Sequence, residues 1–357
     1  MGSDSSDGVH VFSPSTVEGI LLTLAIGSGN ASGGLKTIDA SPVVADGWHN
    51  AFAALTAWNG RYWLAYRRGS GHTARDGVIV VSVSSDLLAW EEVALFQTGA
   101  DDRDAQWVVF NGRLWLYFNS LRDGLFAIYA SQTEDGRTWS EPERVYRDGF
   151  ILWKPIERDG LLYAGAHRPG TDAERGAELV CSSDGLAWSR ISTLRAGRGE
   201  SETTLSFAPN GDLTAFLRDQ RQIGGAILES RPPYTEWAER SAGVHLSGHA
   251  AYTIEGVTYV FSRAFACDPP IESDAPRSAL PAEIDQGTIV YTYEEGVLVP
   301  YCLLGPLHEN HDASYATAIV RAGRMWAIFH RARHRYEGTF RYKDAADLLL
   351  AEVPLKK

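Results

Sequence analysis

The strongest signal of the fold lies in residues 111–139. They read Asn-Gly-Arg-Leu-Trp-Leu-Tyr-Phe-Asn-Ser-Leu-Arg-Asp-Gly-Leu-Phe-Ala-Ile-Tyr-Ala-Ser-Gln-Thr-Glu-Asp-Gly-Arg-Thr-Trp. Two apolar runs, at 114–118 and 125–129, follow the pairs Asn-Gly and Asp-Gly. Both pairs are typical of tight β-hairpins, because each accepts the left-handed backbone that such turns require. The stretch therefore predicts consecutive antiparallel strands, followed by a polar turn that ends on Trp139.

The hairpin pattern recurs six times along the chain. Each copy has a glycine in a turn and then alternating aromatic or aliphatic residues; the copies lie at 60–67, 112–118, 160–167, 211–218, 256–263 and 323–330. Their first glycines are 52, 48, 51, 45 and 67 residues apart. A third strand follows in most units, at 78–82, 125–129, 178–181 and 288–292, with a weaker fourth strand at 144–146. Four strands per unit of about 50 residues are typical of a propeller blade, so we expect an all-β, six-bladed β-propeller in a single domain spanning 1–357.

A second repeat follows the third strand of three units. Residues 84–90, 133–139 and 182–188 each begin with Ser or Thr, carry an aspartate two residues later and end on tryptophan. The aspartates, Asp86, Asp135 and Asp184, are 49 and 49 residues apart, and a degenerate copy occupies 230–237. A short aspartate closes a turn by accepting backbone hydrogen bonds, and the tryptophan has the size to fill the space between neighbouring blades.

Composition excludes several classes of protein. The 357 residues carry 33 basic and 45 acidic side chains, for a formal charge of −12, which argues against nucleic acid as a partner. The three cysteines are far apart and predict neither disulfides nor a metal site. The first ten residues lack the pattern of a signal peptide, and the apolar run at 17–26 is too short to span a membrane. We therefore expect a cytoplasmic protein with no cofactor, metal or membrane partner; the sequence leaves its oligomeric state open.

The second repeat has the residues of the Asp-box, and at this point the chain resembles the sialidase (neuraminidase) superfamily of six-bladed β-propellers. The resemblance covers about residues 45–352. It implies that the run at 17–26 and the run at 347–353 are strands that together close the last blade. Asp-boxes also occur on propellers of other function, so they indicate the fold more strongly than the chemistry.

Three segments are similar to the catalytic segments of sialidases. Residues 312–320 resemble the segment with the nucleophilic tyrosine, which implies Tyr315. Residues 200–205 resemble the segment with the glutamate that takes the tyrosine proton, which implies Glu202, and Arg218 falls where one arginine of the carboxylate-binding triad is expected. Tyrosine needs such a partner because its ordinary pKa near 10 leaves it protonated at neutral pH.

Other segments depart from the sialidase pattern. The family's first arginine lies in a Phe/Tyr-Arg-Ile-Pro segment, but residues 48–55 here contain neither arginine nor proline. In the loop expected to carry the acid/base aspartate, His72 lies closest to its place and Asp76 is the nearby carboxylate. Residues 102–105 are similar to the Arg-Asp-Pro segment of furanosidase propellers and make Asp104 a further catalytic candidate. We expect Tyr315, Glu202, His72 and Asp104 to be the catalytic residues.

Polar residues at the ends of the inner strands of a propeller converge on one mouth. An arginine at or near the end of the second strand recurs in most units, which favours an anionic or heavily hydroxylated ligand. Trp153 and Trp48 have rings on which a sugar could stack. The expected substrate-binding residues are Arg68, Asp76, Arg103, Arg218, Arg263, His49, Asn50, Trp153, Lys154 and Asp312.

Three functions stay open on the sequence. The first is an exo-acting glycoside hydrolase of sialidase type, in which Tyr315 attacks the anomeric carbon and His72, Asp76 or Asp104 protonates the leaving oxygen. The second is a polysaccharide lyase, in which arginine neutralises a uronate carboxylate and His72 or Tyr315 removes the α-proton. The third is a propeller that binds sugar without turning it over.

Overall fold

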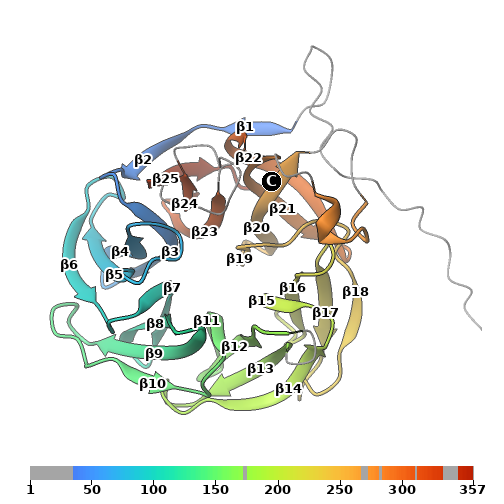
Figure 1. Ribbon diagram of the computed structural model, residues 1–357, viewed down its shortest axis with the longest axis horizontal. Helices are drawn as coiled ribbons and strands as arrows, with labels where there is room; N and C mark the ends of the chain where they lie inside the picture. The colour runs from blue at the N-terminus through green and yellow to red at the C-terminus, as the bar shows by residue number, and fades with distance from the viewer. Residues whose placement is uncertain are drawn as a thin grey trace, which may run out of the picture.

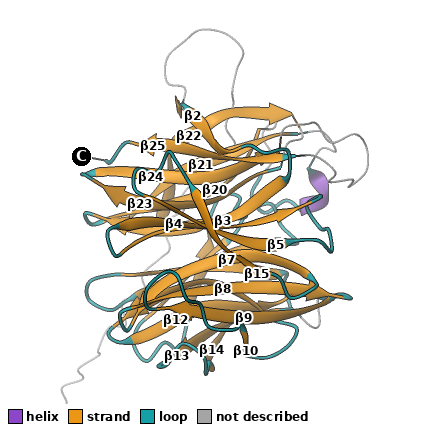
Figure 2. Cartoon of the chain, turned by 90° about the vertical axis from the view of Figure 1, so that its left-hand side faces the viewer, coloured by secondary structure: helices purple, strands orange, loops and turns teal. Residues whose placement is uncertain are grey.

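The computed structural model describes residues 35–171, 175–266, 272–280, 284–309, 312–332 and 345–356. Within these ranges the chain consists of β-strands joined by turns, with a short 3₁₀ helix η1 (Arg277–Ala279) at one edge of the molecule (Figure 2). The described part of the chain contains no helix long and apolar enough to cross a membrane. The strand expected at 17–26 lies outside the described residues.

Three of the sheets have four antiparallel strands each. The first contains β7 (Asp101–Phe110), β8 (Arg113–Arg122), β9 (Leu125–Thr133) and β10 (Glu143–Val145). The second contains β11 (Ile151–Arg158), β12 (Leu161–Arg168), β13 (Gly176–Ser182) and β14 (Ser189–Ala196). The third contains β15 (Glu200–Phe207), β16 (Leu213–Asp219), β17 (Ala226–Ser230) and β18 (Ala238–Ser241). Each sheet begins with a hairpin that the repeated glycine pattern predicts.

The two larger sheets contain the remaining strands. One has β19 (Ala250–Ile254), β20 (Val257–Ala266), β21 (Asp285–Glu294) and β22 (Val297–Glu309), with β1 (Lys36–Ile38) parallel to β22. The other has eight strands: β3 (His49–Trp58), β4 (Arg61–Gly69), β5 (Val78–Ser84), β6 (Glu91–Phe96), β23 (Ala313–Arg321), β24 (Arg324–Ala332), β25 (Ala346–Val353) and β2 (Ala40–Val44). β2 pairs with β25, so in the described chain this strand flanks the C-terminal run.

The eight-stranded sheet consists of two antiparallel groups. β3 to β6 form one group, and β2 with β23 to β25 forms the other. A single parallel pair, Ala346 with His49, joins them. The described residues therefore form five hydrogen-bonded sheets instead of the six separate sheets expected, because this one pair links the first strand group to the last.

The sheets are arranged in a ring (Figure 1). The strands nearest the middle are β3, β7, β11, β15, β19 and β23, and the outermost ones include β6, β10, β14 and β18. Each inner strand packs against the next in this order, and β23 packs against β3. Residues at the same end of these strands therefore meet at the centre although they are far apart in sequence.

The core lies between neighbouring sheets, and the tryptophan turns help to fill it. Trp139 packs against Trp63 of β4 and Trp107 of β7, with ring centroids 6.3 and 5.9 Å apart. Trp188 packs edge-on against Tyr117, whose hydroxyl donates to the Gly185 carbonyl at 2.6 Å. These contacts agree with the prediction that the repeated tryptophans occupy the space between sheets, where large aromatic side chains bury much apolar area.

Candidate active site

Five of the six inner strands have a break in their hydrogen-bond ladders. β3, β7, β11, β15 and β23 each contain a β-bulge against the next strand. At four bulges a residue other than glycine has a left-handed backbone; these are Phe52, Asp104, Lys154 and Tyr315, with φ of 56°, 55°, 44° and 52°. Bulges re-aim side chains, and such φ values are strained for ordinary residues and concentrate at functional sites. The bulges thus identify one end of the inner strands as the candidate site.

Glu202, at the bulge of β15, is the centre of a hydrogen-bond network. Its Oε1 accepts from the Tyr315 hydroxyl at 2.8 Å and from Arg218 at 2.8 Å. Its Oε2 accepts from the Gly248 N–H at 2.8 Å. Burial by itself would raise the pKa of Glu202, but Arg218, His249 and these donors hold it well below its ordinary value. Glu202 is therefore a carboxylate that keeps its charge in the free protein.

The Tyr315 ring is fixed by its neighbours. Phe52 and Trp153 contact it edge-on, with centroids 4.7 and 5.8 Å away. Gly248 has φ +54°, and a Cβ there would lie 2.6 Å from Cδ2 of Tyr315. The Tyr315 ring therefore leaves no room for a side chain at this position, and the positive φ also favours glycine. Burial and the charge of Glu202 raise the pKa of the Tyr315 hydroxyl, so Tyr315 is a neutral phenol in the free protein.

Asp104 and Lys154 add two ionisable groups to the same centre. Burial raises the pKa of Asp104 to about 6, with Glu202 among the charges that raise it and Arg103 opposing. Asn119 donates to Asp104 Oδ2 at 3.4 Å. Burial lowers the pKa of the Lys154 ammonium to about 8, although the charges of Asp104 and Glu202 oppose this shift. A carboxyl with its pKa near 6 is suited to proton transfer at moderate pH.

Three arginines lie close enough to influence one another. Burial, together with the positive charges of Arg218 and Arg263, lowers the pKa of Arg277 to about 10. In the described part of the chain, Nε of Arg218 and one terminal nitrogen of Arg277 are buried without a hydrogen-bond partner. Buried guanidinium donors without partners are costly. The cluster is therefore suited to an anionic group that would accept from these donors.

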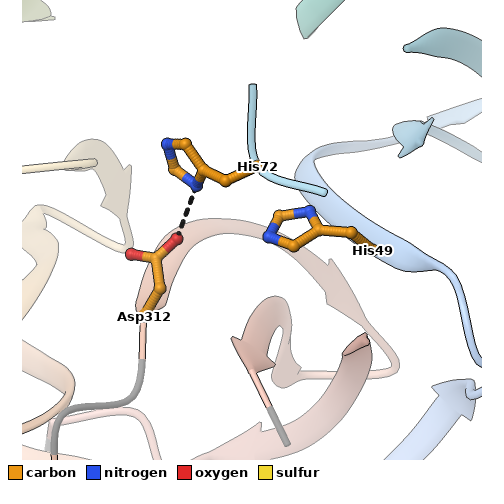
Figure 3. Close-up of side chains that lie close together, drawn as sticks. All are labelled: His49, His72 and Asp312. Carbon is orange, nitrogen blue, oxygen red and sulfur yellow. Dashed lines mark ion pairs between the residues drawn. The ribbon is translucent and has the colours of Figure 1, made fainter. Parts of the chain in front are cut away.

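Asp312, just before β23, links the arginines to a group of histidines. Its Oδ1 accepts from Arg263 at 2.6 Å. Its Oδ2 lies 3.0 Å from Nδ1 of His72 and 3.2 Å from Nε2 of His330. Burial alone would raise the pKa of Asp312, but Arg263 and His72 hold it well below its ordinary value. His49 lies beside this group, with its ring centroid 5.5 Å from that of His72 (Figure 3).

Most of the predicted residues thus meet at one end of the inner strands. Arg103 lies at the edge of this group, where it donates to the His72 carbonyl at 2.9 Å and its guanidinium covers the Phe52 ring. Trp153 is buried and donates to the His249 carbonyl, so its ring supports Tyr315 and is not an open surface for a sugar. The residues in or beside the centre are Tyr315, Glu202, Asp104, Lys154, Arg218, Arg263, Asp312, His72, His49, Arg103 and Trp153.

Three predicted binding residues do not join the centre. Arg68 forms ion pairs with Glu92 of the outer strand β6 and with Asp46. The exposed Asp76 accepts from the backbone and hydroxyl of Ser70, so it closes its own loop. The buried Asn50 donates to Asp46 Oδ1 at 2.7 Å and orders the turn before β3. The structure therefore gives each of these three side chains a local partner, and a polar residue at a strand end often serves its own loop in this way.

The sequence interpretation missed Phe52, Gly248 and Arg277. Phe52, Asp104, Gly248 and Tyr315 each precede the first glycine of their hairpin by eight residues, and Lys154 and Glu202 do so by six and nine. That offset, applied to every unit, would have marked Phe52 and Gly248. Arg277 belongs to η1 in the connection between β20 and β21, where no repeat pattern points to it.

The geometry provides a buried phenol with an adjacent carboxylate, a second carboxyl whose pKa is raised to about 6, and a cationic cluster beside them. Such a set can support displacement at a carbon that bears a leaving oxygen, with proton transfer at both ends.

Comparison with known proteins bears on the fold. No family model and no curated protein sequence matches the chain. Among solved structures it is similar to the endosialidase of phage phi92, with a TM-score of 0.62, 9% identity, and coverage of 90% of this chain and 70% of that one. Trypanosoma rangeli sialidase gives a TM-score of 0.62 at 12% identity, over 89% of this chain.

The similarity to the trypanosomal enzyme covers 58% of that protein, so the present chain spans somewhat over half of its length. At this level of identity the match concerns the path of the backbone. The chain therefore has the fold of the sialidases.

Proposed function

We propose that the chain is a six-bladed β-propeller and an exo-acting glycoside hydrolase of sialidase-like type, with an anionic sugar as substrate. The observation that carries the proposal is the 2.8 Å hydrogen bond from the Tyr315 hydroxyl to Glu202. In the blade count, β3 to β6 form one blade and β2 with β23 to β25 another, since a single residue pair joins them. The turns at Asp86, Asp135 and Asp184 then serve as its Asp-boxes.

The reaction has two steps. In the first, Oη of Tyr315 attacks the anomeric carbon, its proton passes to Glu202, and Asp104 gives its proton to the leaving oxygen as the glycosidic bond breaks. In the second, the Asp104 carboxylate takes a proton from water, which attacks the same carbon, and Glu202 returns the proton to Tyr315 as the tyrosine–sugar bond breaks. All three groups end as they began.

We assign the acid role to Asp104 and not to His72 because of the partners and the electrostatics of the two groups. His72 directs Nδ1 to Asp312, and its ring packs on Phe52, which also contacts Tyr315. The charge of Asp104, by contrast, acts on the pKa of Tyr315. A general acid must hold its proton at moderate pH, and burial raises the pKa of Asp104 to about 6 but lowers that of His72.

An anionic substrate would also make Glu202 a better base. Arg218 is the strongest stabiliser of the Glu202 charge. A substrate carboxylate that takes up the Arg218 guanidinium would weaken this stabilisation and raise the pKa of Glu202. The proton of Tyr315 would then transfer only after the correct ligand is bound, which ties the activation of the nucleophile to recognition of the anion.

The test is a panel of aryl glycosides of sialic acid and uronic acids, with release of the aryl alcohol as the readout. T. rangeli sialidase has been described as a covalent intermediate with 2,3-difluorosialic acid. The same reagent, and its uronic acid analogue, should add one sugar to this chain at Tyr315, as located by peptide mass spectrometry. Cleavage that persists in Tyr315→Phe would overturn the proposal. An unsaturated, ultraviolet-absorbing product from a uronate glycan would indicate the lyase alternative instead.

A further inference from the structure

Three side chains of metal-ligand type meet beside the Tyr315–Glu202 pair. They are His49, the first residue of β3; His72, in the connection between β4 and β5; and Asp312, just before β23. One ligand atom from each lies within 4.8 Å of the others, and Nδ1 of His72 is 3.0 Å from Oδ2 of Asp312. Figure 3 shows the three converging from separate segments, with one ring nitrogen of His49 directed toward the other two.

His49 has an environment that its protein neighbours do not explain. Its side chain is only 2% exposed, and within the described residues neither of its ring nitrogens has a hydrogen-bond partner. A buried polar group without a partner is costly, whereas the lone pair of a neutral imidazole is a good metal ligand.

Asp312 has the support that metal-binding carboxylates receive. Arg263 binds its Oδ1, and Nε2 of His330 lies 3.2 Å from its Oδ2. Hydrogen bonds of this kind orient a ligating carboxylate and are common around metal sites. Oδ2 is the oxygen that faces His72, so the atom available to an ion is already aimed at the cluster.

We propose that His49, His72 and Asp312 bind one divalent transition-metal ion, with Zn²⁺ as the representative case. Two imidazoles and one carboxylate favour Zn²⁺ and its first-row neighbours, and they do not suit Ca²⁺ or Mg²⁺, which prefer oxygen ligands. Two ligands with bonds of about 2.1 Å at a tetrahedral angle lie about 3.4 Å apart, so His72 Nδ1 and Asp312 Oδ2, now 3.0 Å apart, would separate slightly around the ion. The ligand atoms lie within 4.8 Å of one another, so the His49 side chain would move by about an ångström to complete the site.

The ion would join the first and last strands of the ring. His49 and His72 belong to the β3–β6 group, and Asp312 leads into the β23–β25 group, where Ala346 and His49 make a single pair. A metal there would add a strong link across the junction. This inference is independent of the proposed function, because it concerns binding and not turnover.

The test uses the full chain after dialysis against EDTA, titrated with ZnCl₂ by isothermal calorimetry. We expect one equivalent to bind, and His49→Leu, which removes both ring nitrogens and keeps an apolar volume, to weaken binding more than about 100-fold. The matched control is His245→Asn. His245 is also buried, and its Nδ1 faces the Ile223 carbonyl at 2.6 Å, where an asparagine amide can still donate. Zinc binding by this control should be unchanged.

Thermal melting gives a second readout. Zn²⁺ should raise the Tm of the wild type and EDTA should lower it, whereas the Tm of His49→Leu should respond to neither. If no ion exists, His49→Leu should be as stable as the wild type or more so, because it removes buried unpaired nitrogens. The proposal is overturned if zinc fails to bind, if CaCl₂ binds in its place, or if His49→Leu binds zinc as tightly as the wild type.

Discussion

The polar turns after the third strand and the bulges of the inner strands are both repeated around the ring, yet they repeat in opposite ways. In the turns, the same atoms make the same bonds. The hydroxyls of Ser84, Thr133 and Ser182 accept from the N–H three residues later at 2.9, 2.8 and 2.9 Å. Asp86, Asp135 and Asp184 each accept from the N–H two residues later at 2.8 Å.

At the corresponding places of the inner strands, no two side chains are alike. They are Phe52, Asp104, Lys154, Glu202, Gly248 and Tyr315. The turn residues satisfy their own backbone, which demands the same chemistry in each copy. The residues of the inner strands surround one centre. There, a residue contributes a new chemical group only if it differs from the residues at the same place in the other units. Residues that are the same in every unit thus indicate a structural role. Residues that differ at the same place in each unit indicate a candidate functional site.

Tyr315→Phe should have the largest effect on turnover, because it changes the centre and leaves the outer turns intact. Loss of the hydroxyl removes the nucleophile and leaves the ring contacts to Phe52 and Trp153, so we expect turnover to fall roughly a thousand-fold or more while the fold is kept. Initial rates on the best substrate of the panel, with circular dichroism, measure both effects. The control Tyr117→Phe removes a hydroxyl that bonds to the Gly185 carbonyl of an outer turn, and it should keep its rate. Equal rate losses in the two variants would count against the distinction.

Asp104→Asn should give the next largest effect, about 100-fold on turnover. Asp104 must be protonated to act as the acid, and burial raises its pKa to about 6, so turnover should fall as the pH rises through 6. The variant should lose this dependence together with most of its rate. Asp76→Asn, on an exposed loop residue, should retain the wild-type pH profile. An unchanged alkaline limb in Asp104→Asn would transfer the acid role to another group.

Gly248→Ala should reduce turnover roughly tenfold, because the added Cβ displaces the Tyr315 ring, and its positive φ also costs stability. Gly243→Ala separates these effects. Gly243 has φ +67°, and a Cβ there would meet no atom within 4 Å. Both variants should be less stable in urea, but only Gly248→Ala should be slower per folded molecule. A comparable slowing of both would show that backbone strain alone explains the loss.

Ser182→Ala should leave the centre untouched. Its hydroxyl donates to Asp184 at 3.1 Å and accepts from the Gly185 N–H at 2.9 Å, so its loss should lower the free energy of unfolding by about 1 kcal/mol. Urea denaturation measures this change, and turnover per folded molecule should equal that of the wild type. A slower enzyme of unchanged stability would contradict the structural role of the turns.

Much of the fold could be predicted from the chain because its signals are local. Hairpin glycines and alternating apolar residues specify strands within a few positions of themselves, and the strands at Arg113–Arg122 and Leu125–Thr133 follow the predicted pattern. The sheet count differed by one because it depends on a single pair between Ala346 and His49. These two residues lie near opposite ends of the sequence. No local pattern reports such a contact.

The candidate site divides in the same way. The strands and turns follow from neighbouring residues along the chain, and the charged residues can be read from it directly. The contacts between distant residues become visible only in three dimensions. Tyr315 meets Glu202, and Arg277 joins Arg218 and Arg263. Arg68 and Asp76 instead bind partners outside the centre. Closing the ring brings together side chains as distant in sequence as Glu202 and Tyr315, which are 113 residues apart. Their pKa values then depend on the burial and the charges at the centre.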